Sequence, residues 1–204
     1  METRREHWDR VYETKASDSV SWYQPTPEPS IHALYDLGVP ITASLIDVGG
    51  GASTLIDNLL HRGWSDLTVI DIAGPALEAA KARLRQAADR VQWLVADVTQ
   101  WHPERTYDIW HDRAVFHFLT EPEQRATYRQ ALEAGTAQGS MVVVATFAPD
   151  GPERCSGLPV QRYDAAALAA EFGSAFTLLR EWREEHRTPA GGNQAFQWCM
   201  LRRN

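Results

Sequence analysis

Along most of the 204-residue chain, short apolar runs alternate with longer segments in which apolar residues recur every three or four positions. Short runs of this kind predict strands, and the longer periodic segments predict helices. We expect strands near 44–48, 67–71, 91–96, 107–111, 140–147, 176–183 and 195–202. We expect helices near 53–62, 75–87, 121–134 and 164–172. The alternation predicts an α/β fold with a largely parallel sheet.

The last two predicted strands are separated by a short segment that contains PAGGN. A connection of this length suits an antiparallel hairpin and is too short for a crossover helix. The chain length fits one domain over 1–204. Within it, we expect an N-terminal helix and lid segment over 1–40, which contains PTPEP, and an α/β core over 41–204.

The composition narrows the classes of partner. A net charge of −7 argues against nonspecific binding to nucleic acid or to anionic membranes. No apolar run approaches the roughly 20 residues that span a bilayer, and the start, METRREHWDR, lacks the apolar core of a signal peptide. Cys155 and Cys199 lack the spacing of a metal site. We therefore expect a cytoplasmic protein without a metal ion, and composition leaves the oligomeric state open.

The most informative motif is LIDVGGGAS, in which an apolar run ends in Gly49, Gly50 and Gly51 and a helix-like segment follows at once. Glycines at such a turn let the backbone approach a ligand closely, because no Cβ intervenes. The next apolar strand, LTVID, ends in Asp71, twenty positions after Gly51. That is the distance at which a strand-end carboxylate meets a nucleotide ribose in a βαβ unit. The alternatives are a glycine-rich turn without a ligand and an Asp71 that caps the following helix.

Two further strand ends carry polar residues, and ligands of open α/β sheets lie beyond the carboxyl ends of the strands. Asp97 and Val98 follow the third predicted strand, where the acid belongs either to a ligand site or to a tight turn. Arg113 follows the fourth strand and is a candidate for cofactor contact, although it could instead pair with Asp112. His117 is a candidate for substrate contact and catalysis, or alternatively a core histidine.

The acid Asp47, two residues ahead of Gly49 and Gly51, resembles motif I of the class I S-adenosylmethionine (SAM) methyltransferases. The dehydrogenase fingerprint G-x-G-x-x-G fits less well, because Thr54 stands where a small residue is expected. The resemblance implies a Rossmann-like, seven-stranded, mostly parallel sheet with an antiparallel last strand and helices on both faces. It also implies SAM as cofactor and S-adenosylhomocysteine as product.

The opening Trp8-x-x-x-Tyr12, followed by Trp22 before motif I, resembles the protein-lysine methyltransferases that act on elongation factor 1A. In that group, three aromatics, the motif I glycine, an acid with its neighbour after the second and third strands, and a basic residue after the fourth contact SAM. Together with Gly50 and Gly51 of the turn, the resemblance assigns SAM contacts to Trp8, Tyr12, Trp22, Gly49, Asp71, Ile72, Asp97, Val98 and Arg113. The alternative for the aromatics is a stripe that docks the first helix, and Arg113 stands where lysine would be expected.

The methyl acceptor stays open at this stage. The resemblance suggests a protein lysine, but small-molecule thiol, halide and thiopurine methyltransferases carry a similar lid. Methyl transfer mostly requires alignment and exclusion of water, and a lysine acceptor must also lose a proton, for which His111, Asp112 and His117 are candidates. We expect the acceptor pocket to involve the segment PERCSGLPVQRY, with Arg154, Cys155 and Tyr163. A nucleotide-dependent oxidoreductase and a non-catalytic SAM-binding protein are the competing hypotheses.

Overall fold

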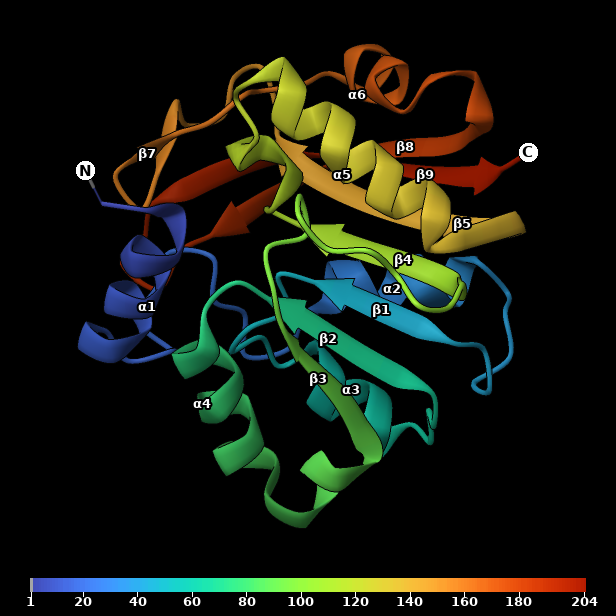
Figure 1. Ribbon diagram of the computed structural model, residues 1–204. Helices are drawn as coiled ribbons and strands as arrows, with labels where there is room; N and C mark the ends of the chain where they lie inside the picture. The colour runs from blue at the N-terminus through green and yellow to red at the C-terminus, as the bar shows by residue number, and fades with distance from the viewer. Residues whose placement is uncertain (1) are drawn as a thin grey trace.

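The computed structural model describes residues 2–204, which fold around a seven-stranded sheet (Figure 1). The sheet contains β1 (Leu45–Val48), β2 (Leu67–Asp71), β3 (Val91–Val95), β4 (Tyr107–Arg113), β5 (Thr136–Phe147), β8 (Phe176–Arg187) and β9 (Asn193–Arg203). The helices are α1 (Arg4–Thr14), α2 (Glu28–Asp36), α3 (Leu55–His61), α4 (Gly74–Leu84), α5 (Pro122–Ala134) and α6 (Ala165–Phe172). Short 3-10 helices cover Arg85–Arg90, Phe116–Phe118 and Gly173–Ala175, and β6 (Arg154–Cys155) pairs with β7 (Leu158–Pro159) in a separate hairpin.

The strands are ordered β3-β2-β1-β4-β5-β9-β8. The first five pair in parallel, whereas β9 lies antiparallel between β5 and β8. Every residue of β1 and β2 is buried, as expected for central parallel strands that are covered on both faces. The predicted seven-stranded sheet with an antiparallel last strand is confirmed.

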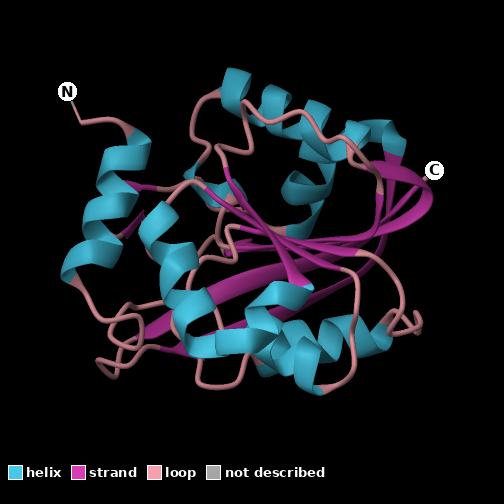
Figure 2. Cartoon of the chain, turned by 60° about the horizontal axis from the view of Figure 1, so that its bottom comes forward, coloured by secondary structure: helices cyan, strands magenta, loops and turns pink. Residues whose placement is uncertain are grey.

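Helices cover both faces of this sheet (Figures 1 and 2). On one face, α5 and α6 enclose a core that includes Trp110, Phe116 and Tyr128. On the other face, α2 and α3 pack over β1 and β2 through residues such as Ile31 and Leu59. Among residues 2–204, no helix combines the length and apolar character needed to cross a bilayer.

One strand begins earlier than its sequence pattern predicts. β5 starts at Thr136 rather than near residue 140, through the polar stretch TAQGS. Gly139 adopts a φ of +89° there, and the Ser140 hydroxyl accepts the Ala137 N–H at 3.0 Å while donating to the Tyr107 carbonyl at 2.8 Å. The serine side chain thus satisfies backbone groups at a bulge, which alternation of apolar residues cannot reveal.

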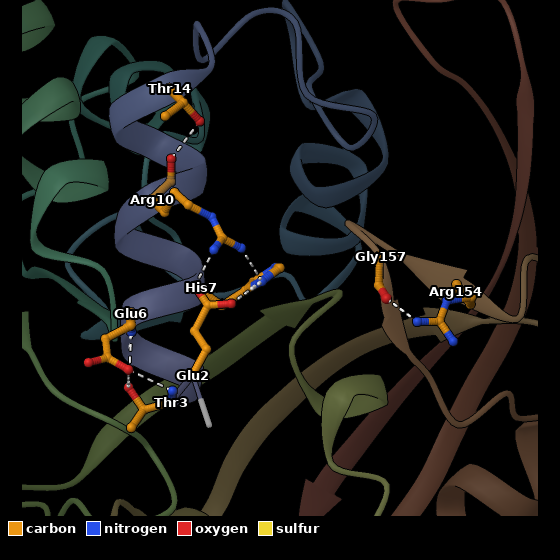
Figure 3. Close-up of polar contacts among 8 residues, drawn as sticks. All are labelled: Glu2, Thr3, Glu6, His7, Arg10, Thr14, Arg154 and Gly157. Carbon is orange, nitrogen blue, oxygen red and sulfur yellow. Dashed lines mark hydrogen bonds and ion pairs between the residues drawn. The ribbon is translucent and has the colours of Figure 1, made fainter.

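The N-terminal segment contains two helices where one was predicted. α1 begins with a capping box, in which Thr3 Oγ1 accepts the Glu6 N–H and the Glu6 carboxylate accepts the Thr3 N–H at 2.8 Å (Figure 3). α2 follows PTP and has Pro29 in its first turn, where proline costs no hydrogen bond. In Figure 1, α1 lies beside α4, beyond the carboxyl ends of β1, β2 and β4.

Candidate active site

A cavity lies between α1 and the carboxyl ends of β1 to β4. Its walls enclose about 760 Å³ of space outside protein atoms, part of which is open to solvent. The predicted contact residues that line it are Trp8, Tyr12, Trp22, Gly49, Asp71, Ile72, Asp97, Val98 and Arg113. Gly50 lines an adjoining cavity of about 580 Å³, and Gly51 lines neither.

The glycine turn after β1 has no room for side chains. A Cβ added to Gly49 would lie 2.0 Å from Val115 Cγ2, and one added to Gly51 would lie 2.7 Å from Asp71 Oδ2. Both glycines also have positive φ, +66° and +37°. The turn therefore requires glycine for backbone conformation and for space.

Asp71 is a buried carboxylate that is only partly used by the protein. Its Oδ1 accepts the Ala73 N–H at 2.8 Å, while its Oδ2 faces the backbone of Gly51. Burial, reinforced by the nearby carboxylates of Asp47 and Asp9, raises the pKa of Asp71 from 3.8 to about 7. Asp71 is not the N-cap of α4, because that position is Ala73.

Asp97 and Val98 line the cavity at the end of β3. Asp97 Oδ1 accepts hydrogen bonds from the N–H and hydroxyl of Thr99, at 2.9 and 2.7 Å. Its Oδ2 lies 3.6 Å from the Arg4 guanidinium of α1. Asp97 therefore has the turn-forming role and a position in the cavity at once, so the two readings of this residue are compatible.

Arg113, the last residue of β4, is nine-tenths buried and lines both cavities. It donates to the Trp22 carbonyl at 3.2 Å, lies 3.5 Å from Glu184, and stacks over the Phe196 ring at 4.5 Å. Its buried Nε has no hydrogen-bond partner among residues 2–204. The expected alternative, a pair with Asp112, does not form.

Asp112 faces away from Arg113 and organises the turn after β4. It accepts the N–H groups of Val115 and Phe116 at 2.9 and 3.3 Å, and the Tyr128 hydroxyl at 2.6 Å. Burial raises the pKa of Asp112 from 3.8 to about 6, against the effect of these donors. Asp112 thereby fixes the segment that supplies Val115 to the cavity wall.

The Tyr128 hydroxyl gives a stability prediction. The raised pKa of Asp112 means that its ionisation costs stability as the pH rises through about 6, and the Tyr128 donor reduces that cost. Tyr128→Phe should therefore lower the free energy of unfolding in urea by about 1–3 kcal/mol at pH 8, and by less at pH 5. Tyr35→Phe, at a position 65% exposed, is the control and should have no effect at either pH. Equal losses from Tyr128→Phe at both pH values would contradict this role.

The other two candidate bases, His111 and His117, also make hydrogen bonds inside the protein. The ring of His111 is buried, with Nδ1 2.7 Å from Asp47 Oδ1 and Nε2 3.0 Å from the Ser30 hydroxyl. His117 is fully buried, its Nδ1 accepts the Phe147 N–H at 3.2 Å, and burial lowers its pKa to about 3. Its buried Nε2 has no hydrogen-bond partner among residues 2–204, so His117 is a core histidine with one ring nitrogen unsatisfied, and it does not line either cavity.

The three N-terminal aromatics gather at the cavity. Trp8 lies 5.6 Å from Trp22 and 5.1 Å from Phe118 between ring centroids, and Trp22 Nε1 donates to the Tyr12 hydroxyl at 3.3 Å. The cluster therefore docks α1 and forms part of the cavity wall at once.

The segment after β5 contributes fewer side chains to the cavity wall than the sequence predicted. Cys155 lines the cavity, but Arg154 is exposed and donates to the Gly157 carbonyl within its hairpin (Figure 3). Tyr163 is buried against Phe116. Sequence reasoning missed Arg4 and Leu119 as lining residues, because no motif spacing relates them to the strand ends.

Comparison with known proteins agrees with this geometry. Residues 45–139 match the model of a methyltransferase domain family. Over 90 residues the chain is 27% identical to the EEF1A lysine methyltransferase 2 of Mus musculus, a match that spans 40% of this chain and 37% of the mouse protein.

Several solved structures share the fold over nearly the whole chain. A SAM-dependent methyltransferase from Anabaena variabilis has a TM-score of 0.78 at 14% identity, covering 100% of this chain and 96% of that one. A Burkholderia thailandensis 1,6-didemethyltoxoflavin-N1-methyltransferase, with bound 1,6-didemethyltoxoflavin and S-adenosylhomocysteine, has a TM-score of 0.75 at 19% identity and coverages of 98% and 87%. A structure that concerns conversion of a disulfide bond into a thioacetal group during echinomycin biosynthesis has a TM-score of 0.79 at 17% identity and coverages of 99% and 92%.

The fold is therefore that of the class I methyltransferases. Residues 45–139, 95 of the 204 residues, match the methyltransferase domain family, and the fold is shared with solved SAM-dependent methyltransferases.

Proposed function

We propose that this chain binds SAM in the cavity between α1 and the ends of β1 to β4, and transfers its methyl group to an acceptor. Asp71 carries the proposal, because it is a buried carboxylate with one oxygen held by Ala73 and the other beside Gly51. A carboxylate so placed would accept charge-assisted hydrogen bonds from ribose hydroxyls, each worth about 1.5–3 kcal/mol. The glycine turn, where an added Cβ would clash, lets the backbone approach the same ligand closely.

The remaining contacts follow the order of the strands. We assign the adenine to Asp97 and the Val98 amide at the end of β3, and the ribose to Asp71 with Ile72 at the end of β2. The glycine turn would receive the methionine part of SAM. Arg113, whose buried Nε has no partner among residues 2–204, would supply positive charge to its carboxylate.

The aromatic cluster of α1 would cover the bound cofactor. Ring faces attract a sulfonium by roughly 0.5–2 kcal/mol, depending on desolvation. Trp8, Tyr12 and Trp22 line the cavity from the N-terminal segment, and Arg4 links α1 to Asp97. The lid and the α/β core would therefore act as one methyltransferase domain over 1–204.

The chemistry requires little beyond positioning. When bound, SAM supplies a methyl group that its sulfonium already activates. The protein's share is to align acceptor and methyl and to exclude water, which can supply about 7–11 kcal/mol. The buried groups around Asp112 keep Val115 and Leu119 fixed at the cavity wall, and α1 closes the site from the outside.

Two acceptor classes have support. The name of the mouse relative points to a protein lysine, over the 40% of this chain that it matches. The toxoflavin methyltransferase acts on a small molecule, and the echinomycin structure concerns sulfur chemistry. These likenesses favour a small acceptor over most of the chain's length.

Equilibrium binding tests the cofactor proposal. SAM and S-adenosylhomocysteine should bind with micromolar or lower dissociation constants in calorimetry and change the tryptophan fluorescence, whereas NAD should do neither. Trp22→Phe should reduce the fluorescence change, because Trp22 lines the cavity. Binding of NAD without SAM would favour the oxidoreductase hypothesis. An unchanged response in Trp22→Phe would contradict the lid.

A further inference from the structure

The two ends of the large cavity differ in chemistry. The carboxylates that line it, Asp71 and Asp97, follow β2 and β3. The other end, after β4, is lined by Val115, Phe118, Leu119 and Cys155, with Trp8 of α1. Because β1 separates β2 from β4, the two ends lie about 9–10 Å apart. No carboxylate among residues 2–204 lines the β4 end of this cavity.

Among residues 2–204, no side chain that lines the β4 end is a carboxylate or a histidine that could accept a proton. The nearest candidates are held by other groups: His111 by Asp47 and Ser30, and Asp112 by Tyr128 and two backbone amides. His117 is used by the backbone of β5 and stays outside the cavity. Burial raises the pKa of Cys155 to about 11, so its thiol stays protonated at neutral pH.

Without a base, the acceptor must reach the methyl group already deprotonated. An aliphatic amine has a pKa of about 10.4 and a thiol about 8.5, so at pH 7.5 roughly 0.1% of the amine but about 10% of the thiol is nucleophilic. An ammonium group would also enter an apolar wall without a carboxylate. A thiol acceptor brings no ammonium group into this wall.

Resting on the proposed function, we propose that the methyl acceptor is a small apolar thiol, which reacts as its thiolate at the β4 end of the cavity. The thiol loses its proton to water before it enters. The thiolate sulfur then forms a bond to the methyl carbon while the bond from that carbon to the sulfonium sulfur breaks. The electron pair stays on that sulfur, so the products are a methyl thioether and neutral S-adenosylhomocysteine. The acceptor is small because it shares the cavity with the cofactor, and the β4 end of that cavity is bounded by Trp8, Phe118 and Leu119.

A matched panel of acceptors tests this assignment. Purified protein with radiolabelled SAM is offered benzenethiol, phenol, benzylamine and benzimidazole at pH 7.5, and the rate without protein is subtracted. We expect kcat/KM for benzenethiol to exceed that for each of the others by at least 30-fold. Faster transfer to the amine, the phenol or the azole would overturn the thiol assignment, as would bound SAM with no transfer to any thiol. Failure to bind SAM in dialysis would instead overturn the proposed function, so the two failures are distinguishable.

The pH dependence separates an acceptor-controlled step from an enzyme base. Below its inflection, kcat/KM for each thiol should rise tenfold per pH unit, and the inflection should lie higher for 1-butanethiol than for the more acidic benzenethiol. A common inflection for both thiols would reveal a base on the protein and overturn the proposal.

His117→Gln provides the matched variant, because the amide can still accept the Phe147 N–H. Its profile should equal that of the wild type. A hundredfold loss of kcat with SAM binding intact would overturn the proposal.

Discussion

Asp71→Asn is expected to weaken SAM binding at least tenfold at pH 8. Asparagine keeps the shape of the side chain and can still accept the Ala73 N–H, but it offers the ribose hydroxyls no negative charge. Charged hydrogen bonds exceed neutral ones by about 1 kcal/mol or more each, and tenfold in affinity is 1.4 kcal/mol. Isothermal titration calorimetry measures the difference directly.

The same variant should abolish a pH dependence. Burial raises the pKa of Asp71 from 3.8 to about 7, so at pH 6 most of the free protein carries the neutral acid. Wild-type affinity for SAM should therefore rise about tenfold between pH 6 and pH 8, and that of Asp71→Asn should stay flat. Because the pKa of Asp71 is higher in the folded protein than in the unfolded chain, ionisation of Asp71 lowers the stability of the cofactor-free wild type as the pH rises from about 4 through 7. Asparagine should remove this contribution of Asp71 and leave that of Asp112, so weaker binding cannot be attributed to unfolding.

Asp66→Asn is the control for this experiment. Asp66 carries the same charge just before β2, at the opposite end of the strand, in an exposed ion pair with Arg105. Its replacement should leave the SAM affinity unchanged. If Asp71→Asn also bound SAM like the wild type at pH 8, the ribose assignment would be wrong.

The sheet was largely predictable because its strands are marked by short apolar runs in the local sequence. Runs such as LIDV and LTVID are apolar at every buried position, and the short PAGGN connection excludes a crossover helix. The start of β5 was not predictable, since Ser140 replaces ladder bonds with contacts to Ala137 and Tyr107. α2 was missed because its proline-rich approach resembles a loop.

The candidate site, like the fold, has a part that could be predicted from the sequence and a part that could not. Gly49, Asp71 and Asp97 could be brought together from the sequence, because the carboxyl ends of parallel strands share one edge of the sheet. The contacts of His111 and Asp112 could not be predicted from the sequence, because their partners Ser30 and Tyr128 lie in helices distant along the chain. Adjacent strand residues point to opposite faces, so both side chains are consumed inside the core rather than facing the cavity.

Gly49→Ala should have the largest effect on the glycine turn. An L-residue at a φ of +66° costs about 1–2 kcal/mol, and the new methyl would lie 2.0 Å from Val115 Cγ2, a stiff β-branched side chain. Overpacking of this kind typically adds about 1–3 kcal/mol. We therefore expect SAM affinity to fall at least 30-fold in calorimetry, with a lower melting temperature, because the turn must move toward the space proposed for the cofactor.

Two further variants separate clash from backbone strain. Gly139→Ala has a φ of +89° but no atom within 4 Å of the added methyl, so it should cost stability alone and leave SAM binding unchanged. Gly49→Ala combined with Val115→Ala removes the clashing methyl group and should recover part of the lost affinity relative to Val115→Ala alone. A coupling free energy near zero in this double-mutant cycle would mean that the two residues do not meet. In that case Val115 does not hold the turn, and closeness of β4 to the glycines cannot explain why position 49 excludes a side chain.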